Sequence, residues 1–339
     1  MNLKTFITHR LPFSIIVLLG LSILIFSIAR VIPGDPVRVA LGDRVSEEVV
    51  ERVRKEMFLD RPIHIQYFMW IRNMAKGELG RSLFTRREVS EDIKEFFPAT
   101  LELALLSGFF MSFFGILLGT LAAQRKNSWI DNIVRVISYL GVVTPAFVFA
   151  ILFVLFFGYV LEIFPTAGRI SVLPPPRVTG MMTIDSLLVG NIRAFWNSLQ
   201  HLILPSISLS MASMAQISRI TRSSMSDNLQ KDYIQAHKTY GISQRKIMFK
   251  YLMKPSLIPS ISILGISFAA LISNAFLVEM IFNWPGLSRY GINAILSKDL
   301  NAITGVVMVL GLTFVVVNIL VDFVVAYLDP RIRIRGDKG

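Results

Sequence analysis

Side chains that could carry out chemistry are few in this chain, and their spacing matches no catalytic motif. The sequence has no cysteine, no glycine-rich phosphate loop, no His-Glu-x-x-His zinc motif and no Gly-x-Ser-x-Gly nucleophile motif. We therefore expect no catalytic residue, no metal site and no cofactor bound by this chain, so that any ATP would be hydrolysed by another chain. Its four histidines are scattered: His9, His64, His201 and His237.

The most distinctive polar segment runs from residue 226 to residue 259 and is rich in lysine and arginine. Ser226 or Asp227 can cap the start of a helix, and Ser243 is placed to cap a second one. Gly241 lies between them and supplies the positive φ with which many helices end. The pattern predicts two short helices joined by a sharp bend, a surface suited to docking a soluble partner protein.

Long apolar stretches surround this segment and define the class of protein. Hydrophobic residues make up 53% of the 339 residues, and the mean hydropathy is +0.58. About 20 apolar residues are needed for a helix to cross the ~30 Å hydrocarbon core of a membrane. The sequence predicts an all-α polytopic membrane protein with six transmembrane helices. These lie at about 11–31, 99–123, 133–160, 201–218, 257–282 and 303–328.

The distribution of basic residues predicts the orientation in the membrane. Net charge is +12, and 17 lysines and arginines lie in the segments assigned to the cytoplasm, against five in the short outer loops. Because cytoplasmic loops carry such an excess, both termini are expected inside and residues 161–200 outside. The basic residues are thereby accounted for by membrane topology, and we expect no nucleic-acid binding.

The predicted organisation follows from this topology. Val49, Val50 and Val53 recur at helical spacing in the long outer segment, and Pro98 is expected in the first turn of the second span. Gly115 and Gly119 are expected to allow close helix packing. The parts are the cytoplasmic N-terminus and first span (1–31), a small helical extracytoplasmic segment (32–98), a five-helix core (99–328) that contains a cytoplasmic loop (219–256), and a cytoplasmic tail (329–339).

Short motifs along nearly the whole chain resemble those of one family, the B-type permease subunits of dipeptide/oligopeptide ATP-binding-cassette (ABC) importers. The resemblance covers residues 1–336, and its collinear motifs make it specific for the family. They are Ile32–Pro36, Leu59–Pro62, Gly77–Ser82, Pro98–Leu103, His201–Pro205, Arg222–Ser224, Asp232–Ile234, Val278–Gly286, Val317–Asp322 and Asp329–Arg333.

The resemblance implies that the basic loop is the cytoplasmic coupling (EAA) loop of these permeases. The family pattern Glu-Ala-Ala, three residues, then Gly reads Gln235-Ala236-His237 and then Gly241 here. His237 departs from the usual alanine, and Lys254-Pro255 departs from the usual Arg-Asn. The residues implied to couple to the ATPase are Asp232, Gln235, Ala236, His237, Gly241 and Ser243.

The resemblance also implies the partners and the location. They are a homologous second permease, two cytoplasmic ATPase subunits or domains that bind ATP and Mg²⁺, an extracytoplasmic solute-binding protein, and the lipid of the cell inner membrane. Peptides are the expected solute. Oligosaccharide and nickel importers share this architecture and stay open as alternatives.

A few ionisable and polar residues in or near the spans are candidates for the translocation path. Asn274 either lines the path or packs between helices, and Glu279 either lines a cavity or braces an outer gate. Asp322 is expected to have a structural partner. An ion-coupled secondary transporter is a more distant alternative, because such proteins place paired carboxylates near the midplane. Here the few acids, including Glu102, lie toward the ends of the spans.

Overall fold

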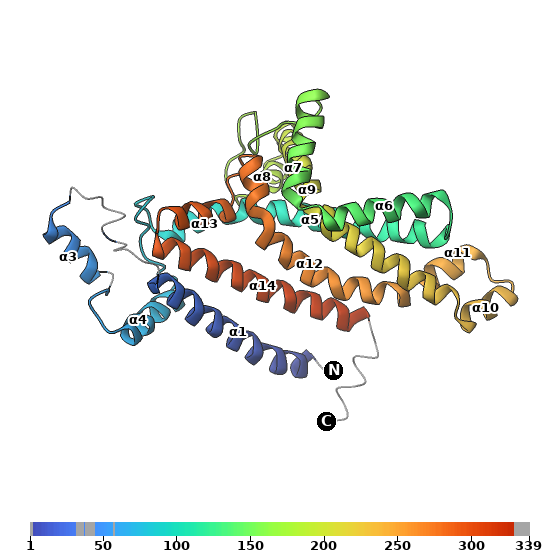
Figure 1. Cartoon of the computed structure of the whole chain (residues 1–339), viewed down its shortest axis with the longest axis horizontal. Helices are drawn as coiled ribbons and strands as arrows, with labels where there is room; N and C mark the ends of the chain where they lie inside the picture. The colour runs from blue at the N-terminus through green and yellow to red at the C-terminus, as the bar shows by residue number, and fades with distance from the viewer. Residues whose placement is uncertain (1–2, 32–36, 38–44, 57, 329–339) are drawn as a thin grey trace. The chain divides into compact units, whose positions relative to one another are not determined.

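A computed structural model describes residues 3–31, 37, 45–56 and 58–328, which are largely helical (Figure 1). Within these residues the strand-like pairing is limited to an isolated bridge between Arg81 and Glu88. The motif at residues 32–36 and the tail at 329–339 lie outside the described residues. The chain divides into a large unit (Met1–Phe6, Leu101–Trp284 and Val316–Gly339) and a small unit (Ile7–Thr100 and Pro285–Val315).

The large unit is built around α9 (Ile192–Leu229), and four helices of the unit make extensive contacts with it. These are α6 (Trp129–Val143), α7 (Ala146–Phe153), α8 (Met182–Leu188) and α12 (Met253–Ile281). The unit also contains most of α5 (Val89–Gln124), the π-helical segment η1 (Val154–Val160), α10 (Asp232–Thr239), α11 (Gln244–Lys246), the π-helical segment η2 (Ile247–Leu252) and the end of α14 (Leu300–Leu328).

Glycines let α5 and α6 approach α9 closely. A Cβ at Gly119 would lie 2.5 Å from the carbonyl oxygen of Ser218, and one at Gly115 would lie 2.9 Å from the side chain of Ile217. On α6, a Cβ at Gly141 would lie 2.7 Å from that of Ala215. The predicted packing role of the Gly-x-x-x-Gly pair is confirmed, because any side chain there would push the helices apart.

The small unit contains most of α1 (Leu3–Val31), together with α3 (Glu47–Glu56), α4 (Ile63–Ala75), the first turns of α5, α13 (Leu287–Leu296) and the start of α14. Its core includes Val89, Ile93, Leu287, Ala302 and Val306, all buried. The helix predicted from Val49, Val50 and Val53 is confirmed as α3.

One sequence prediction about a helix boundary is wrong, and one predicted span is sharply bent. Pro98 lies inside α5, because that helix begins at Val89, with Glu91 and Asp92 in its first turn, where carboxylates favour a helix start. The span predicted at 133–160 is not one straight helix: α6 and the helix formed by α7 and η1 are bent by 109°. The break falls at Thr144-Pro145, where proline holds the preceding residue in an extended conformation.

The structure confirms that the chain contains helices long and apolar enough to cross a membrane. Their number among the described residues is smaller than the six spans predicted from the sequence. Three qualify among the described residues: Val89–Gln124, Gln244–Ile281 and Leu300–Val321. The bent pair makes four if it counts as one span, and α1 contributes a shorter apolar stretch, Pro12–Ile28.

Candidate functional site

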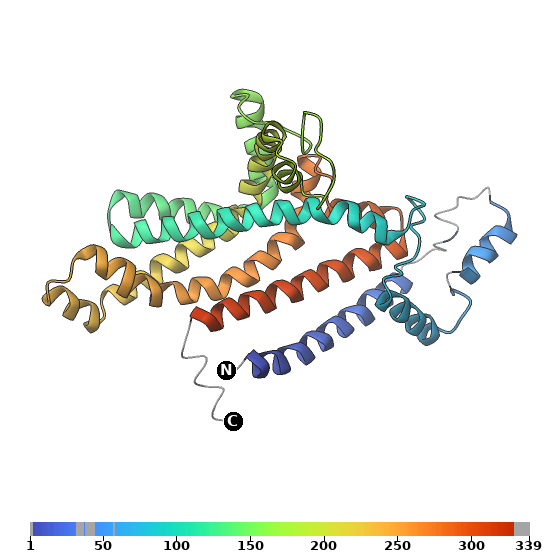
Figure 2. The same cartoon turned by 180° about the vertical axis from the view of Figure 1, so that it is seen from behind.

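The predicted bend in the basic loop is present and is fixed by backbone hydrogen bonds. Tyr240 is the C-cap of α10, and Gly241 follows with a φ of +70°. The N–H of Gly241 donates to the carbonyl of Lys238 (3.0 Å), and that of Ile242 donates to the carbonyl of His237 (3.1 Å). These bonds form a Schellman motif, in which glycine is favoured at the left-handed position. Figures 1 and 2 show α10 and α11 together, beyond the C-terminal end of α9.

Apolar contacts anchor the loop on one side. Ile234 of α10 is fully buried in a cluster with Ala123, Met225, Ile247 and Leu252, while Ile242 packs against the same cluster. The opposite side of the loop is open to solvent. It exposes five of the six residues that the sequence implied for coupling, namely Asp232, Gln235, Ala236, Gly241 and Ser243.

The sixth, His237, is half-buried and supports the loop from within. Its ring centroid lies 4.1 Å from that of Tyr251, and the ring of Tyr233 approaches edge-on at 6.4 Å. The departure from the usual alanine is therefore accommodated by aromatic contacts inside the loop, and His237 is not part of the exposed face.

The predicted caps of this loop are only partly correct. Ser226 and Asp227 lie in the last turns of α9, because that helix continues to Leu229, and Lys231 occupies the position before α10. Ser243 does precede α11, but its side chain makes no capping hydrogen bond. The end of α9 is tied to α12 instead by Asn228, whose Nδ2 donates to Ser256 Oγ at 3.1 Å.

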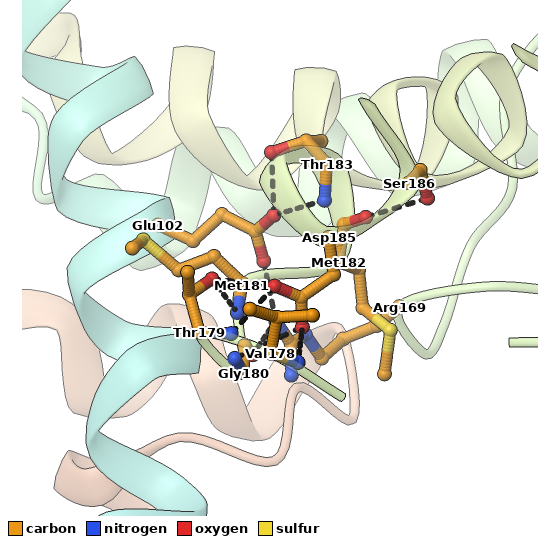
Figure 3. Close-up of polar contacts among 10 residues, drawn as sticks. All are labelled: Glu102, Arg169, Val178, Thr179, Gly180, Met181, Met182, Thr183, Asp185 and Ser186. Atoms are coloured by element: carbon orange, nitrogen blue, oxygen red, sulfur yellow. Dashed lines mark hydrogen bonds and ion pairs between the residues drawn. The ribbon is translucent and has the colours of Figure 1, made fainter. Parts of the chain in front are cut away.

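A second polar site, which sequence reasoning did not assemble, involves the segment at 161–200 that the sequence predicts to be outside (Figure 3), and we call it the outer-loop site. Arg169 of the loop after η1 forms a buried ion pair with Glu102 of α5. The other carboxylate oxygen of Glu102 accepts from the N–H and the hydroxyl of Thr183, each at 2.7 Å. Arg169 also donates to the carbonyl of Gly180 (3.0 Å), and its guanidinium lies 5.4 Å from the ring centroid of Trp284.

Asp185 organises the turn next to this ion pair. Its carboxylate accepts from the N–H groups of Val178 (3.2 Å), Thr179 (2.7 Å) and Gly180 (2.9 Å), and from the Thr179 hydroxyl (2.6 Å). Burial raises the pKa of Asp185, but these hydrogen bonds outweigh burial and leave the pKa below its ordinary value. The carboxylate is therefore ionised at neutral pH and holds the turn rigidly.

His201 fixes the same loop to α9. Its Nδ1 lies 2.8 Å from the carbonyl oxygen of Asn197, and its Nε2 lies 2.8 Å from Ser171 Oγ. The Ser171 N–H donates to Asn197 Oδ1 at 2.7 Å. His201 is thus a tether for the loop. In the described part of the chain no group of three or more His, Asp or Glu side chains is placed to hold a metal ion.

A third polar site joins the start of α6 to α9. Asp131 is completely buried and forms an ion pair with Arg222 and a second one, at 3.0 Å, with Arg135. Arg222 Nη2 donates to it at 2.7 Å, and the N–H of Asn127 donates at 3.0 Å. The sequence singled out Arg222 only as part of a motif. No pattern around Asp131 indicated its partner, because the two residues are 91 positions apart.

The two candidate path residues have different surroundings on α12. Asn274 is exposed, and its Nδ2 donates to the carbonyl of Ala270 at 2.9 Å. Glu279 is completely buried. It is linked to the outer-loop site through Trp284, whose N–H donates to the Glu279 carbonyl at 2.7 Å and whose ring faces Arg169. Neither residue is brought to the basic loop. The Asp322 side chain lies outside the described residues.

Known proteins with similar sequences cover nearly the full length of the chain. It is 38% identical over 321 residues to the probable D,D-dipeptide transport system permease protein DdpB of Escherichia coli, with 94% of both chains covered. It is 35% identical to the dipeptide transport system permease protein DppB of Alkalihalophilus pseudofirmus (96% and 98% covered) and 36% identical to that of Haemophilus influenzae (97% and 99% covered).

Family comparison gives the same result for both parts of the sequence. Residues 3–104 match the family described as "Binding-prot-dependent transport system membrane comp, N-term". Residues 115–334 match the family described as "Binding-protein-dependent transport system inner membrane component". This range includes the basic loop and, of the outer-loop site, Arg169, Thr183 and Asp185, while Glu102 lies in the first match. The chain therefore belongs to the family of binding-protein-dependent transport system inner membrane components.

Proposed function

We propose that this protein is a transmembrane permease subunit of an ABC importer for peptides of the dipeptide/oligopeptide class. It forms half of a translocation pathway, receives its solute from a solute-binding protein, and is driven by separate ATPase subunits. The observation that carries the proposal is the similarity, over more than nine-tenths of both chains, to permeases named for dipeptide transport. The geometry of the basic loop supports it independently.

The basic loop is the coupling surface to the ATPase. Its exposed side carries Asp232, Gln235, Ala236 and Gly241, while Ile234 anchors α10 in the apolar cluster. Because the bend is held by a Schellman motif, a push on the exposed side moves α10 and η2 together with the ends of α9 and α12. Such a rigid connection can bias a helix bundle between two arrangements.

Six spans with both termini in the cytoplasm are the topology that we propose. Besides the four qualifying regions, α1 supplies an apolar stretch, and α9 supplies a helix in which many polar residues are buried. Ser206, Ser208, Ser210 and Thr221 of α9 are all completely buried within the large unit. A helix with low hydropathy can cross a membrane when its polar side chains face other helices and not lipid.

Thiol labelling tests the topology, because the sequence contains no cysteine. Ser46→Cys and Ser243→Cys both introduce a thiol at an exposed position. On intact cells an impermeant maleimide is expected to label position 46 and to leave position 243 unlabelled until the membrane is opened. Labelling of position 243 from outside would contradict the proposed orientation.

The partners follow from the proposed function. They are a second, homologous permease, two cytoplasmic ATPase subunits or domains that bind ATP and Mg²⁺, and an extracytoplasmic solute-binding protein. This chain lies in the cell inner membrane, contacts lipid, and neither hydrolyses ATP nor binds nucleic acid. Oligosaccharides or nickel would use the same architecture, and solute specificity is the property that sequence similarity constrains least.

Reconstitution of the purified proteins tests the function. In proteoliposomes that hold this chain, its partner permease and the ATPases, we expect ATP-dependent uptake of radiolabelled dialanine only when the loaded solute-binding protein is added. This chain alone is expected to release no phosphate and to take up no solute. Uptake by the chain alone along a proton or sodium gradient would overturn the proposal in favour of a secondary transporter.

A further inference from the structure

A line of lysines lies at the start of the long helix that follows the bend of the basic loop. The residues Gln244–Ile281, which comprise α11, η2 and α12, form one helix that qualifies as a membrane span. Lys246, Lys250 and Lys254 recur at four-residue spacing near its start, and all three are exposed. Residues at this spacing are neighbours on one side of a helix, and we call these three residues the lysine stripe.

The charges of the lysine stripe have no acidic partner within the described part of the chain. Between Asp232 and Glu279 the sequence contains five lysines and arginines but neither aspartate nor glutamate. No ion pair of the described residues involves the stripe, and the Lys250 ammonium lies 5.7 Å from the ring centroid of Tyr251. Like charges four residues apart on a helix repel each other. The stripe therefore favours an anionic neighbour from outside the chain.

The position of the stripe along the helix places it near phospholipid headgroups. The predicted apolar span begins at residue 257. At ~1.5 Å per residue, Lys254, Lys250 and Lys246 lie about 5, 10 and 16 Å before that point. The headgroup layer is about 5–8 Å thick on each side of the hydrocarbon core, and long lysine side chains extend toward it. The surface potential of the membrane reaches about 8 Å further, so that it acts on the whole stripe.

The neighbouring residue types favour a lipid surface over a protein as the occupant. Phe249 is 64% exposed, while every other exposed residue from 243 to 250 is polar or charged. An apolar ring beside basic residues is typical of helices at the membrane interface, where the ring enters the acyl boundary and the charges meet anionic headgroups. Lysine, in contrast, is depleted at protein interfaces. We therefore expect the ATPase on α10 and the bend, and not on the stripe.

We infer that the lysine stripe binds the headgroups of anionic phospholipids in the cytoplasmic leaflet, whose phosphate groups complement its charge. The inference rests on the proposed function, which places the basic loop on the cytoplasmic side. That leaflet carries a negative surface potential, and clusters of basic residues next to a membrane span bind to it. Each lysine near the surface strengthens such binding about fivefold.

Lipid binding at the stripe also fixes the position of the proposed coupling surface. Ile247 and Leu252 lie between the lysines in the sequence and are buried in the apolar cluster that contains Ile234 of α10. A stripe held at the headgroups therefore holds α10 at a defined height above the membrane, through side chains that are already packed. Coupling to the ATPase is thus expected to depend on anionic lipid, although no lipid needs to touch the ATPase.

Substitution of two lysines tests the lipid site in the assembled complex, purified in a neutral detergent. The probe is a fluorescent phosphatidylglycerol, and its Kd is measured by fluorescence anisotropy. Lys250→Gln combined with Lys254→Gln keeps both side chains polar but removes their charges, and we expect Kd to rise about tenfold or more. Lys250→Arg combined with Lys254→Arg keeps the charges and should leave Kd nearly unchanged.

The matched control is Lys231→Gln combined with Lys238→Gln, which removes two exposed lysines of the same loop that lie before the bend. Its Kd is expected to stay within about twofold of that of the unmodified complex, because neither residue belongs to the stripe. Fluorescent phosphatidylcholine, which carries no net charge, should bind the unmodified complex more weakly than phosphatidylglycerol does. Equal Kd values for the two lipids, or an unchanged phosphatidylglycerol Kd in the Lys250→Gln/Lys254→Gln variant, would overturn the inference.

Nanodiscs provide a functional readout of the same variant. ATP hydrolysis stimulated by the solute-binding protein loaded with dialanine (the loaded receptor) is measured in phosphatidylcholine alone and in its mixture with phosphatidylglycerol. The anionic lipid is expected to raise the stimulated rate of the unmodified complex and to leave that of the Lys250→Gln/Lys254→Gln variant unchanged. Loss of ATPase binding by this variant in phosphatidylcholine alone would assign the stripe to the ATPase and overturn the inference.

A failure of the proposed function would give different results. If the unmodified complex takes up no peptide with the loaded receptor, the function is wrong, and if position 243 is labelled from outside intact cells, the orientation is wrong. If uptake and labelling are as proposed and the Lys250→Gln/Lys254→Gln variant binds phosphatidylglycerol normally, only the lipid site is overturned.

Discussion

The basic loop and the outer-loop site lie near opposite ends of α9 and are held in opposite ways. The basic loop is anchored by apolar side chains around Ile234, and its polar residues face solvent. The outer-loop site is held by buried polar groups, with Glu102, Arg169 and Asp185 each bonded to several partners. Polar residues are thus available to a partner at one end and committed to the protein itself at the other.

This difference indicates how each end can change during transport. The exposed side of the basic loop can bind and release a partner without breaking internal bonds. Movement of the outer loop requires the Glu102–Arg169 ion pair to separate or to move as one body with its neighbours. Breaking a buried ion pair by removing one partner is strongly destabilising, so the outer loop is expected to move as a rigid piece.

The largest expected effect comes from breaking this ion pair. Arg169→Met leaves the buried carboxylate of Glu102 without its cation, which is expected to cost about 3–5 kcal/mol of stability. Thermal unfolding of the purified complex should fall by several degrees, and peptide uptake should be lost. The matched control is Arg177→Met, a change at an exposed arginine of the same loop, where an effect below about 1 kcal/mol is expected.

A double variant sharpens the interpretation of that result. Glu102→Gln combined with Arg169→Met removes both charges, so its loss of stability should be smaller than the sum of the two single losses. Strict additivity would show that the two side chains do not interact in the assembled complex.

The next effect concerns the turn organised by Asp185 and its dependence on pH. Asp185→Asn exchanges one acceptor oxygen for a donor facing backbone N–H groups, and we expect a loss of about 1–3 kcal/mol at pH 7. Folding lowers the pKa of Asp185 from the ordinary 3.8. The ionised carboxylate therefore contributes fully to the stability of the folded state above pH 3.8, and this contribution is lost as the pH falls through the lower pKa of the folded state. Unfolding temperatures of variant and unmodified complex should therefore converge below about pH 4. A constant difference down to pH 3 would contradict the role of the ionised carboxylate.

At the other end of α9, Gly241→Val tests whether the bend transmits ATPase closure. The space around Gly241 is open, with nothing within 4 Å of an added Cβ, so the strain comes only from its φ of +70°. A β-branched residue there is expected to cost about 1–2 kcal/mol and to redirect the chain after α10. Uptake should be lost, with ATP hydrolysis no longer stimulated by the loaded receptor, while membrane insertion is unchanged. Gln244→Ala is the control, since Gln244 is exposed in the same loop and is not among the residues implied for coupling. Normal transport by Gly241→Val would remove the bend from the mechanism.

The smallest effect is expected at His237. His237→Ala removes the ring that contacts Tyr251 and restores the alanine usual in the resembled motif, so we expect a loss of only about 0.5–1.5 kcal/mol. Peptide uptake and receptor-stimulated ATP hydrolysis should stay within twofold of normal. Loss of transport with normal thermal stability would place His237 at the ATPase surface, against its half-buried position.

Several features could be predicted from the sequence because they depend on local physics. Gly241 forms the predicted left-handed helix end, since that conformation is accessible to glycine without a Cβ clash. The all-helical class and the apolar spans at 99–123, 257–282 and 303–328 follow from length and hydropathy. The first and third spans lie within α5 and α14, and the second lies within α12 except for its last residue, Phe282, which follows that helix. The family could be identified because its motifs are short, collinear and spread along the chain.

What only the tertiary structure decided is the pairing of residues that are far apart in the sequence. Glu102 meets Arg169 and Thr183, Asp131 meets Arg222, and Asp299 meets Ser82, in pairs separated by 67 to 217 positions. Helical periodicity shows which face of a helix is apolar, but it contains no information about which other helix covers that face. A buried charge needs a specific partner, and only the packing of the helices determines which residue is near enough to be that partner.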